Sequence, residues 1–259
     1  MDDPKLISLF SNLKGRDLRS EGLMIAEGKF LTEELIALKM NILAVLCEKK
    51  LEEHFTGLSE HRFPILAMDK AGISAVAGFP FERSVLCASQ RPLLSDFTDW
   101  IEHHPDTKYM TICPRIYNEE NLGSIIRSSA GLGAEAVCLG PECQDPFSRR
   151  SLKVSMGAVL RIPLSRYDNF NSFTNALKSR GFTLAAAVLD PDAVPLDRYS
   201  PDQKKIALFL GSEEKGLTPD EVRSCDVKLR IPMHNRTDSL NVGVAAGIFC
   251  YHLFKGDGA

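Results

Sequence analysis

Several features that would assign this 259-residue chain to a class at once are missing. No apolar run approaches the roughly 18 residues of a membrane-spanning helix, and no basic-then-apolar leader opens the sequence, so we expect a cytoplasmic protein without membrane segments. The seven cysteines contain no Cys-x-x-Cys pair and the six histidines no His-x-x-x-His pattern. We therefore expect no structural or catalytic metal.

The chain also lacks a basic excess, with 31 Lys and Arg against 34 Asp and Glu and a net charge of -3. Sequence-independent nucleic-acid binding usually leaves such an excess, so any RNA or DNA site must be a local patch. Two basic clusters are candidates for such a patch, and each is equally compatible with a solvated surface face. They are Lys14, Arg16 and Arg19 near the start, and Arg149, Arg150 and Lys153 in the middle.

Short apolar runs alternate with amphipathic runs throughout, which is typical of an α/β protein. The pattern predicts a first α/β domain at 1–90, a polar linker at 91–107 and a second domain at 108–259. First-domain strands are expected near Leu23–Ala26, Ile42–Cys47, Pro64–Ala67 and Val85–Ala88, and second-domain strands at 108–116, 134–140, 158–164, 182–190, 205–211 and 227–233. The second set is apolar without interruption, which predicts a mostly parallel sheet covered on both faces.

Two glycine patterns resemble nucleotide-binding motifs and fail on inspection. Residues 131–136 match Gly-x-Gly-x-x-Ala but follow a predicted helix and precede a strand, so a helix C-cap and turn is expected instead of a dinucleotide site. Gly211 and Gly216 have P-loop spacing, yet no Lys-Ser/Thr follows, and Glu213 and Glu214 would repel phosphate. A glycine at a strand's carboxyl end still permits a ligand to contact the backbone. Either glutamate could instead be a first-turn acid of the helix that begins at Pro219.

Two predicted helices carry polar groups that need an explanation. The helix at 118–134 is capped by Asn118 or Asn121, and its polar stripe is either an exposed surface or a site where Asn121 and Arg127 meet an anionic, oxygen-rich substrate. The last helix begins at Ser239, a natural N-cap, and is apolar nearly all round, so it should be deeply packed. Asn241 would enter that helix and must find partners. Small residues there permit close approach of a backbone or ligand: Gly243, Ala245, Ala246 and Gly247.

Taken in order, these elements resemble the SPOUT superfamily, specifically SpoU-type (TrmH-like) RNA 2′-O-ribose methyltransferases. The motif residues are Asn121, Gly123 and Arg127; Gly211, Ser212, Glu213, Gly216 and Leu217; and Ile231 to Met233 with Ser239 to Val242. The looser match upstream rests on Glu27-Gly28-Lys29 and the strand–helix pattern. The chain departs from the family at Glu214 and Asn235, where glycine is frequent, and at Gly243, where serine is frequent.

The resemblance implies a trefoil-knotted C-terminal domain with helices on both sheet faces, preceded by a small ribosomal-protein-like α/β domain that binds RNA. It implies S-adenosylmethionine as cofactor and methyl transfer to a ribose 2′-hydroxyl in structured RNA, with ribosomal RNA favoured over transfer RNA. It also implies a homodimer in which the arginine of one subunit faces the cofactor of the other. The alternatives are a tRNA 2′-O-methyltransferase, a base methyltransferase of a related branch, or a non-catalytic RNA-binding protein that retains the fold.

The resemblance also assigns roles to individual residues. Catalytic roles are expected for Arg127, Asn121, Glu213, Ser239 and Asn241. Cofactor contacts are expected from Leu189, Leu210, Gly211, Ile231, Met233, Ser239 and Leu240. RNA contacts are expected from Lys14, Arg16, Arg19, Lys29, Arg127, Arg149 and Arg150. Arg127 is the family's proposed base, but a guanidinium stays protonated, so we give equal weight to stabilisation of a phosphate or developing alkoxide.

Overall fold

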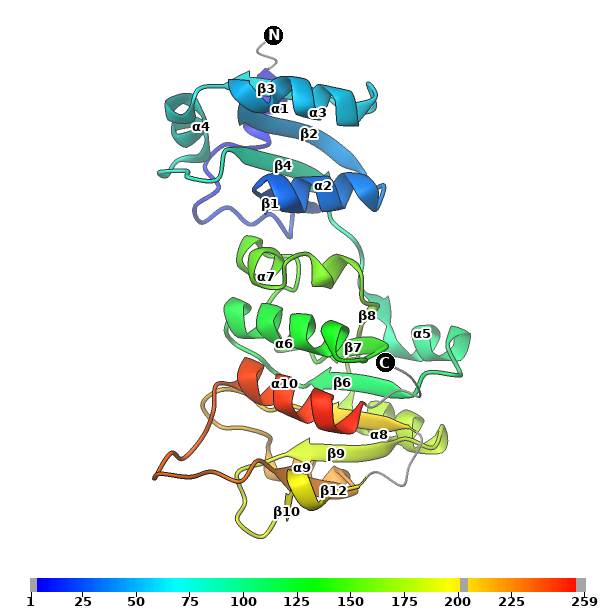
Figure 1. Cartoon of the computed structure of the whole chain (residues 1–259). Helices are drawn as coiled ribbons and strands as arrows, with labels where there is room; N and C mark the ends of the chain where they lie inside the picture. The colour runs from blue at the N-terminus through cyan, green and yellow to red at the C-terminus, as the bar shows by residue number, and fades with distance from the viewer. Residues whose placement is uncertain (1–3, 201–204, 255–259) are drawn as a thin grey trace. The chain divides into compact units, whose positions relative to one another are not determined.

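The computed structural model describes residues 4–200 and 205–254, which form two compact units. The N-terminal unit comprises Met1–Pro92 together with Phe147–Gly157, and the C-terminal unit comprises Leu93–Pro146 together with Ala158–Ala259 (Figure 1). The segment 147–157 therefore belongs to the N-terminal unit, although the sequence pattern places it inside the second domain.

In the described part of the N-terminal unit, a four-stranded sheet has the order β1–β4–β2–β3. Only the β2–β3 pair of this sheet is parallel. The strands are β1 (Leu23–Glu27), β2 (Ile42–Glu48), β3 (Ile65–Met68) and β4 (Val85–Gln90), and the helices are α1 (Pro4–Ser8), α2 (Lys29–Ala37), α3 (Glu52–Ser59), α4 (Lys70–Ala77) and α7 (Arg149–Val154), with a 3-10 turn at Lys49–Leu51. The four predicted strands are confirmed to within two residues at each end.

Helix α7 joins the N-terminal unit through one arginine. The Nε of Arg149 donates to Oε1 of Glu27 at 2.6 Å, and its Nη1 donates to the Leu13 carbonyl at 3.2 Å. Its guanidinium also lies 4.6 Å from the ring centre of Phe79. These contacts engage the charge of Arg149 within the chain, which explains why 147–157 leaves the second domain.

The described C-terminal unit contains an eight-stranded parallel sheet in the order β10–β12–β9–β11–β6–β7–β8–β5. Its strands are β5 (Ser95–Asp96), β6 (Tyr109–Cys113), β7 (Ala136–Leu139), β8 (Leu164–Arg166), β9 (Thr183–Ala187), β10 (Val194–Pro195), β11 (Ile206–Phe209) and β12 (Val227–Arg230). Its helices are α5 (Phe97–His103), α6 (Glu119–Gly131), α8 (Phe170–Ser179), α9 (Pro219–Ser224) and α10 (Val242–Leu253), with 3-10 turns at Ala158–Leu160 and Leu196–Arg198. The prediction of a parallel sheet is confirmed.

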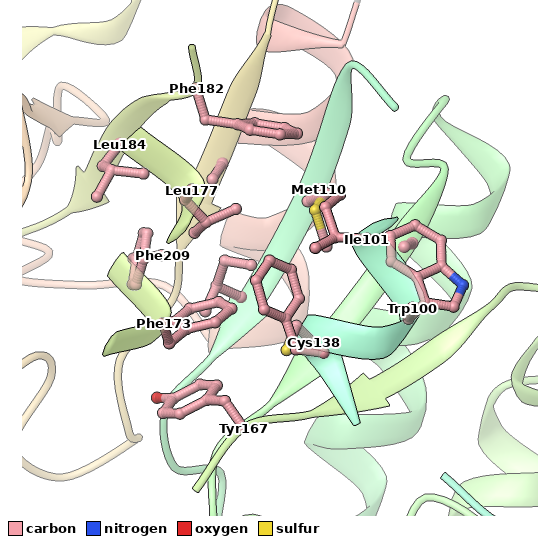
Figure 2. Packing of buried hydrophobic residues seen from close by; sticks show 14 of the residues in the cluster. Trp100, Ile101, Met110, Cys138, Tyr167, Phe173, Leu177, Phe182, Leu184 and Phe209 are labelled. Carbon is pink, nitrogen blue, oxygen red and sulfur yellow. The ribbon is translucent and has the colours of Figure 1, made fainter. Parts of the chain in front are cut away.

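Both faces of this sheet are covered, as alternation along β6 shows. Met110 and Ile112 belong to the core cluster formed with α5 and α8, where Figure 2 shows Phe173 and Leu177 beside the strands. Successive strand residues point to opposite faces, so Thr111 faces the other layer. There its hydroxyl accepts a 2.8 Å hydrogen bond from Ser129 of α6.

Two expectations about local structure are wrong. The segment 91–107 is not a free linker, because β5 pairs with β8 and α5 buries Phe97 and Ile101 in the core. The stretch 158–164 is not a continuous strand: it begins with a 3-10 turn, and β8 starts only after Pro163. Proline has no N–H for a sheet and disfavours helical structure in the residue before it.

No helix in the described residues is both long enough and apolar enough to cross a membrane.

A buried ion pair connects the end of β6 to α9. The guanidinium of Arg115 donates to both carboxylate oxygens of Glu221, at 2.5 and 3.1 Å, and the two side chains are 16% and 6% exposed. Glu221 also accepts from the backbone N–H of Thr218 at 2.7 Å, completing the capping box of α9.

Removing one partner of this pair should be costly. In Arg115→Met the Glu221 carboxylate stays buried without its cation, so we expect a loss of about 3–5 kcal/mol in the free energy of unfolding, measured by urea titration. Arg223→Met is the matched control, because Arg223 pairs with Asp220 on the exposed side of the same helix, where such pairs contribute little. Equal midpoints for both variants would contradict a structural role for the buried pair.

Candidate functional site

A cavity of about 560 Å³ lies at the carboxyl ends of β9, β11 and β12. This is the usual location of ligand sites in open parallel sheets. Its lining includes all the residues expected to contact a cofactor, namely Leu189, Leu210, Gly211, Ile231, Met233, Ser239 and Leu240. Four of the five expected catalytic residues also line it: Asn121, Glu213, Ser239 and Asn241.

Three of these polar side chains form a hydrogen-bonded relay. The Nδ2 of Asn241 donates to Oδ1 of Asn121 at 2.8 Å, and the Nδ2 of Asn121 donates to Oε1 of Glu213 at 2.9 Å. The same carboxylate accepts from the backbone N–H groups of Tyr117 and Asn118 at 3.3 and 3.2 Å. The starts of α6 and α10 are thereby tied to the loop after β11.

Backbone groups fix the direction of this relay. The Oδ1 of Asn241 accepts from the N–H of Gly243 at 2.9 Å and of Val244 at 3.4 Å, so it caps α10 and its Nδ2 must face Asn121. Asn121 then presents oxygen to Asn241 and its amino group to Glu213. Amide orientation is usually assigned from such networks, and here a helix terminus determines it.

The predicted start of the last helix is therefore corrected by two residues. Asn241 is the N-cap of α10, whereas Ser239 lies before the helix, exposed and on the cavity lining. Asn118 caps α6, accepting from the N–H groups of Glu120 and Asn121. Each asparagine satisfies helix N–H groups that would otherwise lack partners.

Gly211 is required by its own loop. A Cβ on this residue would lie 2.1 Å from the carbonyl carbon of Gly216 and 2.2 Å from the nitrogen of Leu217. The loop folds back because Ser212 and Gly216 exchange backbone hydrogen bonds of 3.1 and 2.9 Å. Gly211 thus permits the turn that aims Glu213 at α6, and it also lines the cavity, as expected of a cofactor contact.

The glycines of α10 serve helix packing. A Cβ on Gly243 would lie 2.4 Å from Oγ of Ser124, and a Cβ on Gly247 would lie 3.6 Å from Oγ of Ser128. The polar stripe of α6 is therefore partly an interface with α10. The expectation of deep burial for α10 is wrong on one side, where Val244, Ile248 and Tyr251 are exposed.

Arg127 is the one expected catalytic residue that the structure does not bring to the cavity. It is exposed, it is absent from the cavity lining, and its side chain has no hydrogen bond or ion pair with the described residues. Six positions along an α-helix correspond to about 240° of rotation and about 9 Å of rise, so Arg127 and Asn121 point in different directions.

The expected RNA contacts divide into two groups. Arg16 donates to Glu21 and to the carbonyls of Ser8, Leu9 and Ser11, and Arg149 is engaged as described above, so stabilising roles account for both. The remaining cations of the set are exposed on their units: Lys14, Arg19, Lys29, Arg127 and Arg150. Lys29 lies 3.7 Å from Glu33 in an exposed pair, which contributes little.

Sequence reasoning missed Tyr117 and the cavity residues Val188, Lys215 and Phe249. Tyr117 and Asn118 donate to Glu213 through backbone N–H groups, and these contacts cannot be predicted from the residue type because every residue except proline has such a group.

No group of three or more His, Cys, Asp or Glu side chains in the described ranges is arranged to hold a metal ion.

Two substitutions separate the roles of Asn241. Asn241→Asp keeps an oxygen for the N–H groups of Gly243 and Val244 but cannot donate to Asn121, whereas Asn241→Ala loses both contacts. We expect the aspartate variant to keep a melting temperature near that of the wild type. The alanine variant should lose about 1 kcal/mol of its free energy of unfolding, the usual cost of removing an N-cap, and melt at a lower temperature. Equal destabilisation of both variants would assign the stability to the Asn121 contact instead.

Known proteins share both the sequence and the fold. Residues 109–251 match the SpoU rRNA Methylase family. A Mycobacterium tuberculosis protein named as an uncharacterised tRNA/rRNA methyltransferase is 33% identical over 258 residues, covering 96% of this chain and 88% of the relative. The 23S rRNA (guanosine(2553)-2'-O)-methyltransferase RlmP of Bacillus subtilis is 31% identical over 156 residues, covering 58% and 62%. An AdoMet-bound rRNA methyltransferase from Sinorhizobium meliloti has the same fold, with a TM-score of 0.82, 24% identity, and coverage of 96% and 94%. The family match and the Mycobacterium tuberculosis relative together show that this chain belongs to the SpoU methylase family.

Proposed function

We propose that this chain transfers a methyl group from S-adenosylmethionine to a ribose 2′-hydroxyl in structured RNA. The observation that carries the proposal is the relay from Asn241 through Asn121 to Glu213 on the wall of a cavity at the sheet's carboxyl edge. Its residues are those that the resemblance assigns to the family motifs, and two relatives of this chain are named as 23S rRNA 2′-O-methyltransferases.

The cavity suits this cofactor. Its volume falls within the usual range for small-molecule sites, about 300–1,000 Å³. Leu189, Ile231 and Leu240 offer apolar surface for an adenine ring, while Glu213 and Glu214 offer negative charge for a cationic sulfonium and would repel a triphosphate. When bound, the cofactor supplies an activated methyl group.

The chain's own residues prepare the acceptor. Glu213 already accepts three hydrogen bonds, so its principal task is to hold Asn121 and the loop after β11 in place. The hydroxyl of Ser239, exposed on the cavity wall, is available to the ribose. The 2′-oxygen gains negative charge as its proton passes to solvent water, and a guanidinium, which stays protonated, stabilises that charge or positions the neighbouring phosphate.

Arg127 does not line the cavity of its own subunit, so in this proposal the guanidinium comes from a second copy of the chain. We therefore propose a homodimer with shared sites. Arg127 directly precedes Ser128 of α6, and Ile248 directly follows Gly247 of α10, so the arginine and the exposed apolar residues Val244, Ile248 and Tyr251 lie on one packed helix pair. An interface on this pair would cover the apolar stripe.

The remaining features of the proposal concern substrate and fold. We propose that the N-terminal unit binds RNA, with Lys14, Arg19, Lys29 and Arg150 as its cations, and that ribosomal RNA is the substrate in the cytoplasm. The relative's tRNA/rRNA name supports tRNA as the second candidate. We propose a trefoil knot in the C-terminal unit, since the chain returns from β12 to pack α10 against α6.

Mapping 2′-O-methyl sites in total RNA with and without this gene tests the function, and identical maps would reject it.

Arg127→Ala should abolish methyl transfer without affecting the cofactor site. Loss of one group that stabilises transition-state charge costs about 10²–10³ in turnover. S-adenosylmethionine affinity, measured by calorimetry, should stay at the wild-type value. Arg223→Ala, an exposed arginine on α9, is the matched control and should retain activity. Wild-type turnover by the Arg127 variant would remove this arginine from the mechanism.

Mixing two inactive variants tests the shared site. A subunit with Asn241→Asp has a disrupted relay but can still lend Arg127 to its partner, and a subunit with Arg127→Ala has an intact relay but no arginine to lend. Half of the dimers in a statistical mixture contain both variants, and each such dimer has one intact site, so about a quarter of wild-type activity should return. If each subunit used its own arginine, the mixture would stay inactive.

A further inference from the structure

Tyr117 is an aromatic side chain at the active-site rim to which the proposed function assigns no role. It lies between β6 and α6, and it is 47% exposed. Its backbone N–H donates to Oε2 of Glu213, the last member of the relay. The backbone of Tyr117 is therefore bonded to a residue of the cavity wall, while a large part of the side chain faces solvent.

Both ends of Tyr117 are held. At one end is the bond to Glu213, and at the other the phenol hydroxyl donates to Oε2 of Glu142 at 3.2 Å. Oε1 of Glu142 lies 3.6 Å from Nε of Arg115, which the buried Glu221 fixes in turn. A ring restrained in this way loses little conformational entropy when a flat ligand stacks on it.

The charges around the ring indicate which part of a nucleotide it can accept. Glu142 and Glu213 hydrogen-bond to Tyr117, and Glu214 lies within electrostatic range of its hydroxyl. Desolvation and the Glu142 carboxylate raise the pKa of Tyr117, so the hydroxyl remains a donor at neutral pH. Three carboxylates repel a phosphate, whereas an uncharged base has no such penalty.

We propose that the exposed face of Tyr117 is a stacking platform for a nucleobase of the substrate RNA, next to the ribose that receives the methyl group. This inference rests on the proposed function, because it assigns an RNA base to the rim of that same site. Single-stranded RNA is commonly read by stacking its bases on aromatic side chains. Tyr117 then acts in binding and orienting the RNA strand, and it makes no contact with the cofactor.

The test compares Tyr117→Leu with Tyr117→Phe. Both remove the hydrogen bond to Glu142, but only phenylalanine retains an aromatic face. The acceptor is total RNA from cells that lack this gene, and tritiated methyl incorporation from S-adenosylmethionine is measured. We expect the leucine variant to raise the KM for RNA roughly 5- to 100-fold, the usual effect of losing one base–aromatic stack. Phenylalanine should stay near wild type, and kcat and calorimetric cofactor affinity should change little in both.

Salt dependence supplies a second readout. Stacking neutralises no phosphate, so the slope of log KM against log salt concentration should be unchanged in Tyr117→Leu. Arg150→Ala, which removes an exposed cation of the N-terminal unit, should make that slope shallower.

Several results would overturn the platform. One is a wild-type KM in Tyr117→Leu, and another is equal loss in the leucine and phenylalanine variants, which would assign the role to the Glu142 bond. A fall in kcat or cofactor affinity alone would indicate a structural role, and a sedimentation shift to monomer would make the ring a subunit contact. If the wild-type protein methylates no RNA at all, the proposed function fails and the platform fails with it.

Discussion

The site depends on the orientation of one amide, and the first turn of α10 determines that orientation. Asn241 has to give its oxygen to the N–H groups of Gly243 and Val244, because a helix start without acceptors is costly. Its amino group is thereby directed to Asn121, and the amino group of Asn121 to Glu213. Helix capping, a requirement of folding, thus also positions polar groups for chemistry.

The same arrangement explains why Arg127 lies away from the cavity of its own chain. Asn121 is in the first turn of α6, where the relay anchors it beside the cavity, and Arg127 is almost two turns further along. A straight helix cannot turn both residues to one cavity. The close α6–α10 contact at Gly243 holds the helix pair together, and Arg127 and the apolar residues Val244, Ile248 and Tyr251 of α10 remain exposed on it.

The sequence predicted the residues whose chemistry is local and missed those whose role depends on distant partners. Asn121, Glu213 and Asn241 were identified from short motifs, and strand positions followed from apolar runs. Arg149 looked like an RNA contact because its partner Glu27 is 122 positions away. The segment 91–107 looked like a linker because β5 pairs with β8, about 70 residues later, and long-range pairing is invisible to local patterns. Tyr117 was missed because its bond to Glu213 uses the backbone.

The loop after β11 shows how glycine spacing can suggest the wrong ligand. In a P-loop the glycines expose N–H groups to phosphate. Here Gly211 lets Ser212 and Gly216 bond to each other, and the turn between them carries two carboxylates to the cavity. The same glycine spacing thus accompanies a site that favours cations, whereas a P-loop binds anionic phosphate. A cavity with Glu213 and Glu214 on its wall favours a cationic group, such as the sulfonium that carries the transferable methyl, and disfavours a phosphate. Under the proposed function, the exposed cations of the N-terminal unit and Arg127 of a second copy would supply the positive charge for the phosphates of the RNA.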